Sequence, residues 1–328
     1  MKIGDKPGLR LCVIGDQGAG KSHFLATLYM HLMRLSRKDR SLGAISTDEE
    51  FNGGVGIREN FNRLRTGNPT KPMSAGDSSH VTMTIPIYPD GIQKYLRLLG
   101  ISRPTNIDLH LLDSSGEYQQ FLMADAKITV DGQFSSSQYD DDHVSIQFDD
   151  QTQREFERTT AGLTDKEKVD IDNQFKEILG QYDAYILLYS TLDFNNDDKP
   201  GDPVDIKLTR FLDNVRRYRA ATNSRLPRAV MLAFTKYDLV SSEKFKAYGI
   251  PELSEMEGME YGLLLSPLTY TAIEVMTGNG DPPSVVSYTH MENDRKFKTE
   301  IDPEFGGFVT KYPYETYSEV VEWIKEIG

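Results

Sequence analysis

The sequence predicts an α/β fold of three layers, in which helices cover both faces of a mostly parallel sheet. Short apolar runs alternate along the 328-residue chain with segments whose apolar residues recur at helical spacing. Strands joined by helices pair in parallel, and the helices cover the two faces of the resulting sheet. Apolar residues make up 38% of the chain, which allows a substantial core. We expect a single domain over residues 1–328, with long insertions.

Six apolar runs are predicted as the strands of this sheet. Each run is short and rich in aliphatic residues, which is typical of buried strands. They cover residues 9–14, 81–88, 107–113, 184–190, 229–235 and 284–289.

Helical patterns lie between most of these strands. They cover residues 24–33, 169–179, 206–218 and 317–327. In the second of them the pattern predicts one apolar face. That face would carry Val169, Ile171, Phe175, Ile178 and Leu179.

Insertions interrupt the alternation at residues 41–79, 119–168 and 239–314, and a shorter polar loop covers residues 195–205. The first is rich in Gly, Asn, Ser and Asp and is predicted as a long, partly mobile loop. The second contains acidic runs around VSIQF, whose alternation predicts a small hairpin strand. The third is expected to hold one or two extra helices and a connection rich in Pro and Gly.

Residues 15–22 read GDQGAGKS, which fits the GxxxxGKS pattern of a phosphate-binding loop, or P-loop. Backbone N–H groups of such a loop converge on phosphates, while the lysine supplies charge and the serine hydroxyl binds Mg²⁺. An apolar strand precedes the motif, and a helix follows it whose N-terminus favours anions. The sequence therefore predicts a nucleoside triphosphate as ligand. Its candidate binding residues are Gly15, Asp16, Gln17, Gly18, Ala19, Gly20, Lys21 and Ser22.

Two further motifs follow predicted strands. Residues 113–117 read DSSGE, where Asp113 could hold Mg²⁺ through water and the N–H of Gly116 could reach a γ-phosphate. Residues 235–238 read TKYD, where the Asp238 carboxylate could accept two hydrogen bonds that guanine offers and adenine does not. The Lys236 stem could lie along the base. Each motif alone is also an ordinary turn sequence.

GDQGAGKS, DSSGE and TKYD occur in the order, and on the elements, seen in Ras-like GTPases, so the chain resembles the translation-factor-related (TRAFAC) class of P-loop GTPases. The resemblance covers the predicted sheet and leaves the insertions unmatched. It implies a three-layer P-loop fold whose second strand, residues 81–88, runs antiparallel to the rest. It also implies GTP or GDP with Mg²⁺, and two switch loops. The insertions give a narrower resemblance to GTPases associated with bacterial conflict systems.

Two residues depart from the family pattern. Thr235 stands where asparagine is commoner, a substitution that other members tolerate. Glu117 stands where many relatives have the glutamine that orients the attacking water, and its charge near a γ-phosphate is unfavourable. We therefore expect slow intrinsic turnover with Glu117 as a catalytic residue. A glutamate that faces solvent and has no role is the open alternative.

The first switch requires a threonine that binds Mg²⁺ and touches the γ-phosphate. The candidate is Thr70, in competition with Thr47, Thr66 and Thr82. Arg65 lies close enough before Thr70 in the sequence to act as a built-in arginine finger.

The serine-containing loop that contacts guanine stays open between Ser287 and Ser266. Ser266 is followed by Pro267, which is also typical of a helix N-cap with proline at the first helical position.

Composition narrows the class of partners. The chain has 50 acidic and 37 basic residues, a net charge of −13, which argues against binding to nucleic acid. Cys12 is the only cysteine, which excludes an internal disulfide and favours a reducing compartment. The N-terminus carries no apolar signal, and no apolar run is long enough for a bilayer, so we expect a cytoplasmic protein without a membrane span.

The function that these observations favour is a Mg²⁺-dependent, GTP-hydrolysing molecular switch that acts through a protein partner. The insertion at residues 119–168 follows the second switch, and it is either the place of partner specificity or a solvated decoration. A GTP-binding scaffold with little hydrolysis, which assembles as a nucleotide-dependent homodimer, is one alternative. A P-loop ATPase or kinase is the other.

Overall fold

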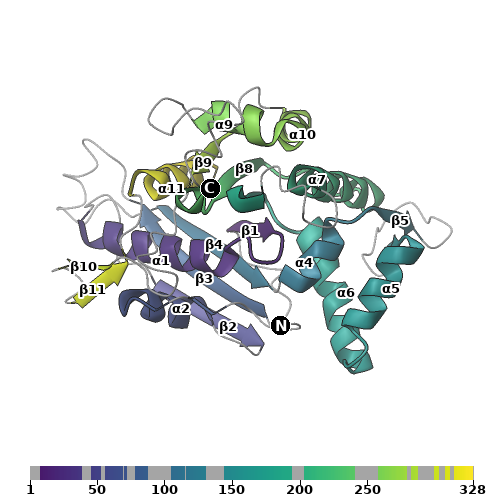
Figure 1. Ribbon diagram of the computed structural model, residues 1–328, viewed down its shortest axis with the longest axis horizontal. Coiled ribbons are helices and arrows are strands. Elements are labelled where there is room, and N and C mark those ends of the chain that lie inside the picture. The colour runs from purple at the N-terminus through teal and green to yellow at the C-terminus, as the bar shows by residue number, and fades with distance from the viewer. Residues whose placement is uncertain are drawn as a thin grey trace. The chain divides into compact units, whose positions relative to one another are not determined.

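The protein is a mixed α/β structure with a mostly parallel sheet, one antiparallel strand and flanking helices (Figure 1). The chain divides into two units, which are described separately. The first comprises Met1–Val13, Lys21–Asp113 and Ser287–Gly328, and the second comprises Ile14–Gly20 and Ser114–Val286. The computed structural model describes residues 8–38, 46–52, 56–68, 70–71, 78–87, 105–114, 116–130, 144–193, 203–240, 258–278, 282–286, 299–302, 307–310 and 314–327.

Strands of the first unit lie in the order β2-β3-β4-β1. Their bounds are β1 Leu9–Gly15, β2 Ser46–Asn52, β3 Ser78–Ile87 and β4 Thr105–Ser114. β1 pairs in parallel with β4, with Cys12 opposite Leu112, and Cys12 is buried as predicted. β2 pairs antiparallel with β3.

β3 also runs antiparallel to β4. The Thr84 hydroxyl donates to Asp108, and Thr82 shares a hydrogen bond with His110. One residue number falls as the other rises, which occurs only between antiparallel strands. The antiparallel direction expected for residues 81–88 is confirmed.

Helices of the first unit pack around α1, which begins directly after the glycine-rich segment. Their bounds are α1 Lys21–Lys38, α2 Ile57–Arg65 and α11 Tyr314–Ile327, and a hairpin joins β10 Thr299–Asp302 to β11 Gly307–Thr310. Rings of Phe24 and Tyr317 lie 5.3 Å apart and join α1 to α11, while Tyr29 and Phe61 lie 5.2 Å apart and join α1 to α2.

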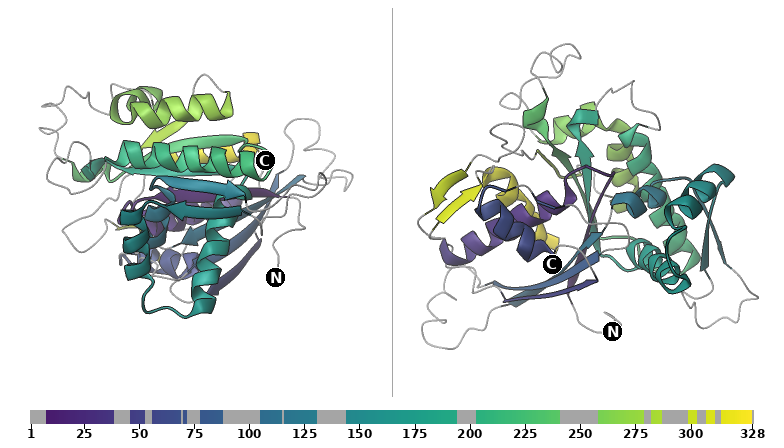
Figure 2. Two further views of the ribbon diagram at one scale, coloured as in Figure 1. Left: turned by 90° about the vertical axis from the view of Figure 1, so that its right-hand side faces the viewer. Right: turned by 60° about the horizontal axis from the view of Figure 1, so that its bottom comes forward.

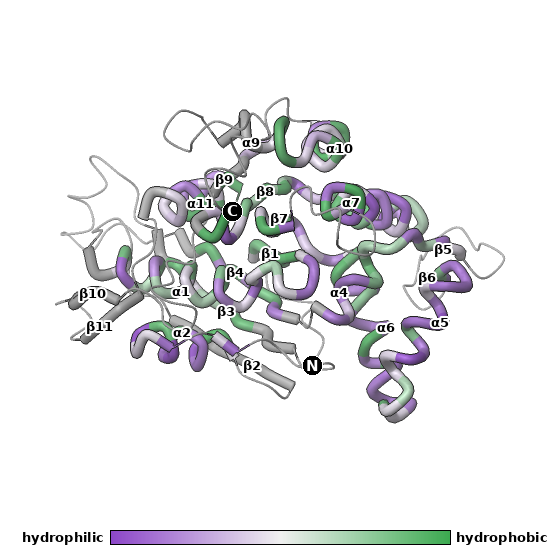
Figure 3. Tube along the Cα trace, viewed as in Figure 1, coloured by the Kyte–Doolittle hydropathy of each residue, from purple (hydrophilic) through white to green (hydrophobic). Residues whose placement is uncertain are grey.

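The second unit has the strand order β7-β8-β9, paired in parallel. Their bounds are β7 Ala184–Ser190, β8 Ala229–Thr235 and β9 Ser284–Val286. Every residue of β7 and β8 is buried, and Figure 3 shows both strands as hydrophobic. Short 3-10 turns follow these two strands, η2 Thr191–Asp193 and η3 Tyr237–Leu239.

Helices α6, α7, α9 and α10 accompany these strands. Their bounds are α6 Asp165–Gly180, α7 Val204–Ala221, α9 Gly258–Leu265 and α10 Pro267–Thr277. α10 lies beside α7 (Figure 2). Ser266 occupies the N-cap position of α10 with Pro267 next, as the sequence predicts. The cap itself comes from α7, because the Asp205 carboxylate accepts hydrogen bonds from the Ser266 hydroxyl at 2.6 Å and the Thr269 N–H at 2.8 Å.

The insertion at residues 119–168 is built around a hairpin, described here without residues 131–143. Its elements are β5 Ala126–Val130, β6 Val144–Phe148 and α5 Asp150–Thr159, which follow α4 Gly116–Leu122. β6 is the strand predicted at VSIQF, and β5 is its antiparallel partner. The Asp149 side chain caps α5 by accepting from the N–H groups of Gln151 and Thr152.

Two expectations from the sequence were wrong. Residues 41–79 were expected to form a long loop, but they contain β2 and α2. β2 reads STDEEFN and is set by pairing with β3 rather than by its own polar pattern. Val169 was expected on the buried face of α6 but is 58% exposed, because it lies two residues before Ile171 and such residues point to different sides of a helix.

The polar loop expected at residues 195–205 ends earlier than predicted, because α7 already begins at Val204. The predicted extra helices in residues 239–314 correspond to α9 and α10. Residues 287–289 of the predicted last strand lie outside the described residues. Within the described part of the chain, no helix combines the length and the apolarity required to cross a bilayer.

Candidate functional site

Residues 15–20, here called the glycine-rich loop, belong to the second unit and form a tight turn. The Ala19 N–H donates to the Asp16 carbonyl at 3.0 Å. Gly18 and Gly20 have φ values of 77° and 93°, a left-handed conformation that residues with a Cβ rarely adopt. This conformation explains the glycines of GDQGAGKS at these two positions.

Three side chains of the second unit hold this loop. The buried Gln119 of α4 accepts a hydrogen bond from the Gly15 N–H at 3.1 Å. The Thr235 hydroxyl at the end of β8 donates to the Ala19 carbonyl at 2.7 Å. Lys207 of α7 forms an ion pair with Asp16, with 2.6 Å between Nζ and Oδ2. The loop is thus held at its first two residues and at Ala19, next to its last residue.

Glu117 also lies against the loop. Its carboxylate accepts a hydrogen bond from the Gln17 side-chain amide at 3.4 Å, and the side chain is half-buried. The structure therefore brings Glu117 and Thr235 together with the glycine-rich loop. Sequence reasoning missed Gln119 and Lys207, because their partners lie 104 and 191 residues away.

TKYD follows β8 and turns sharply. Lys236 has φ 59°, a left-handed conformation, and begins the turn η3. The Thr235 carbonyl accepts a hydrogen bond from the Thr191 hydroxyl at 2.8 Å, which joins the ends of β8 and β7. Asp238 lies in η3, and its side chain is outside the described part of the structure.

The candidate Mg²⁺ residues Ser22 and Asp113 belong to the first unit. Lys21 and Ser22 open α1, and Lys21 is buried with 7% exposure. Asp113 is 1% exposed and directly follows the stretch of β4 that pairs with β1. A hydroxyl and a carboxylate are oxygen ligands of the kind that Mg²⁺ takes together with water and phosphate oxygens. The residues present therefore fit this ion, although the described residues hold no group of three or more His, Cys, Asp or Glu suited to a metal.

Thr70 follows α2 in the first unit, and the backbone beside it is bonded to a side chain of that helix. The buried Asn60 of α2 donates to the Lys71 carbonyl at 3.1 Å and accepts from the Lys71 N–H at 2.8 Å. This pair of bonds fixes the backbone next to Thr70.

Two of the threonines that are alternatives to Thr70 form hydrogen bonds within the first unit. The Thr66 hydroxyl donates to the Arg63 carbonyl at 2.9 Å, at the end of α2, and Thr82 bonds to His110. The Thr47 side chain and Ser287 lie outside the described residues.

The Arg65 guanidinium lies 5.7 Å from the ring centroid of Phe61, a stacked position on its own helix.

No family model matches the chain, and no curated protein matches it. The function therefore rests on the residues of the site. The second unit offers a glycine-rich turn with a half-buried carboxylate beside it, and the first unit offers two oxygen ligands of the kind that Mg²⁺ takes.

Proposed function

We propose that this chain binds GTP with Mg²⁺ and hydrolyses GTP slowly, as a molecular switch that acts through a protein partner. The hydrogen bond from the Thr235 hydroxyl to the Ala19 carbonyl carries the proposal. It ties TKYD, whose chemistry suits guanine, to the glycine-rich loop, whose chemistry suits phosphates. A nucleotide that binds TKYD through its base and the loop through its phosphates would account for a bond between Thr235 and Ala19, which lie 216 residues apart.

The fold in this proposal is the three-layer P-loop fold. A mostly parallel sheet with β3 as its antiparallel strand is compatible with it. The single, buried Cys12 is compatible with the proposed cytoplasmic location.

Each site residue has a part in the proposed reaction. Loop N–H groups and Lys21 bind the phosphates, and Lys236 and Asp238 bind guanine. Ser22 and Asp113 would hold Mg²⁺ with Thr70, and the ion, when bound, neutralises phosphate charge. The Gly116 N–H binds the γ-phosphate, and Glu117 orients the attacking water.

A second candidate function is a GTP-binding scaffold with little hydrolysis, which assembles with like subunits. The observation that favours it is the hydrogen bond between Gln17 and Glu117. A carboxylate that is held by the loop carries its charge toward the γ-phosphate and is not available to orient water.

Nucleotide binding tests the proposal. Calorimetry with GTP, GDP, XTP and ATP, with and without Mg²⁺, should give tight binding of GTP and GDP only. The Asp238→Asn variant should prefer XTP, because the altered side chain matches xanthine instead of guanine. Asp170→Asn, an exposed carboxylate on α6, is the matched control and should keep the guanine preference. A preference for ATP in the wild-type chain would overturn the proposal.

Phosphate release separates the two functions. Slow turnover that Glu117→Gln changes would support the switch, and self-activation at high protein concentration would indicate a dimerising GTPase. No turnover at any protein concentration, with GTP bound, would favour the scaffold.

A further inference from the structure

Helix α4 contacts the glycine-rich loop through the side chains of two residues. Gln119 is 1% exposed, and its side-chain oxygen accepts from the buried Gly15 N–H. Glu117, two residues earlier, accepts from Gln17. A buried N–H that loses its acceptor is unfavourable, so the loop and α4 are expected to hold each other in place.

The C-terminal part of α4 enters a cluster of four phenylalanines, here called the phenylalanine cluster. It consists of Phe121 of α4, Phe148 of β6, Phe156 of α5 and Phe175 of α6. The ring of Phe121 lies 5.1 Å from that of Phe156, edge to face, and 6.0 Å from that of Phe148. The insertion therefore packs into the second unit rather than only decorating it.

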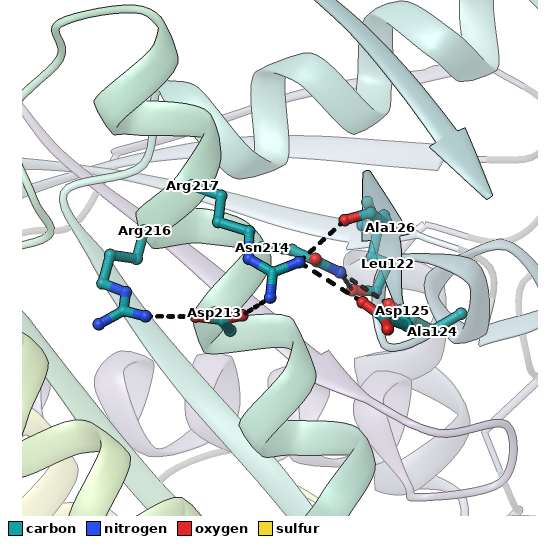
Figure 4. Close-up of polar contacts among 8 residues, drawn as sticks. All are labelled: Leu122, Ala124, Asp125, Ala126, Asp213, Asn214, Arg216 and Arg217. Atoms are coloured by element: carbon teal, nitrogen blue, oxygen red, sulfur yellow. Dashed lines mark hydrogen bonds and ion pairs between the residues drawn. The ribbon is translucent and has the colours of Figure 1, made fainter. Parts of the chain in front are cut away.

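Polar bonds to α7 hold the end of α4 and the start of β5 (Figure 4). The buried Asn214 donates to the carbonyls of Leu122 and Ala124 at 3.0 and 2.8 Å. Arg217 donates to the Ala126 carbonyl at 3.2 Å, and Asp125 lies 3.5 Å from the same guanidinium. These bonds attach the end of α4 and the start of β5 to α7.

Gln119 and Phe121 are two residues apart in a helix of seven residues. Such residues point to different sides of a helix, so a short helix carries the two contacts as one rigid piece. A displacement at Phe121 therefore moves Gln119.

We propose that Gln119 is a positioning residue for the glycine-rich loop, and that the insertion, through the phenylalanine cluster, sets the position of α4 and so how firmly the loop is held. Where the loop binds nucleotide, a step that rests on the proposed function, the insertion controls the rate at which nucleotide leaves. Anything that displaces β6 or α5 would then act on the nucleotide through α4.

Hydrogen exchange tests the coupling without any nucleotide. In the nucleotide-free full chain, Gln119→Met removes the acceptor and should raise exchange in residues 15–20. Gln119→Glu keeps an acceptor oxygen and should restore protection. Phe156→Ala, in the insertion, should also raise exchange in residues 15–20, and should add little in a Gln119→Met background.

A matched control separates coupling from a general loss of stability. Ile273→Ala removes buried apolar volume from α10, in the same unit but outside the phenylalanine cluster, and should leave exchange in residues 15–20 unchanged. Phe156→Leu keeps the apolar volume and loses the ring contacts, and it is the test variant if Phe156→Ala unfolds. Unchanged exchange in residues 15–20 in a folded Phe156 variant would overturn the coupling.

Nucleotide release tests the consequence. After a chase with excess GDP, fluorescent GDP should leave Phe156→Ala about three- to tenfold faster than wild type, since an aromatic pair is worth about 0.5–1.5 kcal/mol. Equal release rates would overturn the control of release by the insertion. If the wild-type chain binds no guanine nucleotide, the proposed function fails, and the exchange result still decides the coupling.

Discussion

Asp16 and Lys207 form an ion pair inside the second unit, with side chains that are only 17% and 27% exposed. Removing one partner leaves the other charge partly buried and uncompensated, which costs more than the pair contributes. We expect Lys207→Met to lower the free energy of unfolding by about 1–3 kcal/mol, and Asp16→Asn in the same chain to recover most of the loss. Urea unfolding of the single and double variants measures both effects.

Lys325→Met is the control for this prediction. Lys325 pairs with Glu322 on the same helix, and Glu322 is 65% exposed, so the loss should stay below about 1 kcal/mol. If Lys207→Met and Lys325→Met lowered the free energy of unfolding equally, burial would not make the Asp16–Lys207 pair more important for stability than an exposed pair.

His31 is fully buried on α1, with its Nε2 3.2 Å from the Ser318 hydroxyl of α11. Burial, with a smaller effect of the Arg34 charge, lowers the pKa of His31 from 6.5 to about 4. Between these values the unfolded chain binds a proton that the folded chain does not. The contribution of His31 to the free energy of unfolding is therefore fully present above pH 6.5. It falls as the pH drops toward 4, by up to about 1.4 kcal/mol per pH unit.

Urea unfolding at several pH values between 7 and 4 measures this dependence. His31→Gln should be less stable at pH 7 but should lose less stability than wild type across this window. Parallel curves for the two proteins would contradict the role of His31.

At the level of residues, the sequence predicted those parts of the candidate site that are contiguous motifs. Gly18 and Gly20 of the GDQGAGKS motif adopt a left-handed backbone that glycine accommodates, and Thr235 of the TKYD motif reaches the loop. Gln119 and Lys207 could not be predicted, since nothing in their neighbourhood indicates a partner more than a hundred residues away. Such contacts are decided by the fold and leave no local pattern.

At the level of elements, α10 depends on a side chain of α7. The Asp205 carboxylate accepts from the N–H groups of Leu268 and Thr269 and from the hydroxyls of Ser266 and Thr269. Asp205→Ala would leave these donors without their acceptor, and we expect a loss of about 2–4 kcal/mol in the free energy of unfolding.

Ser266→Ala is the matched variant for this cap. It removes only one donor and leaves the backbone N–H groups bonded to Asp205, so the loss should be about 1 kcal/mol. Chemical denaturation measures both variants. A Ser266→Ala loss as large as that of Asp205→Ala would assign the cap to the serine instead.

Helices and strands could be predicted from the sequence where burial requires a continuous or regularly spaced run of apolar residues. β7 and β8 are buried throughout and match the predicted ranges. β2 was missed because an edge strand of polar residues is defined by its partner. α2 was missed because Asn60, a polar residue, occupies a buried position between Ile57 and Leu64 and interrupts the apolar pattern.

At the level of the whole molecule, the net charge of −13 opposes association with other polyanions. We expect no complex with duplex DNA or with RNA at physiological ionic strength, because there is no excess of cations to release the counterions of the phosphate backbone. Fluorescence anisotropy with labelled oligonucleotides measures this. A complex that weakens steeply with added salt would reveal a local basic surface and contradict the prediction.

The cap on α10 also bears on the order in which the chain folds. The carboxylate that completes the first turn of this helix comes from 64 residues before Thr269. A helix nucleates locally, but this one gains its cap only after α7 has formed and the chain between them has closed a long loop. In pulse-labelled hydrogen exchange during refolding, the amides of Leu268 and Thr269 should become protected after those of α7, and simultaneous protection would contradict this order. The Asp205 carboxylate would then couple the formation of α10 to that of α7, so that α10 forms late in the folding of its own unit.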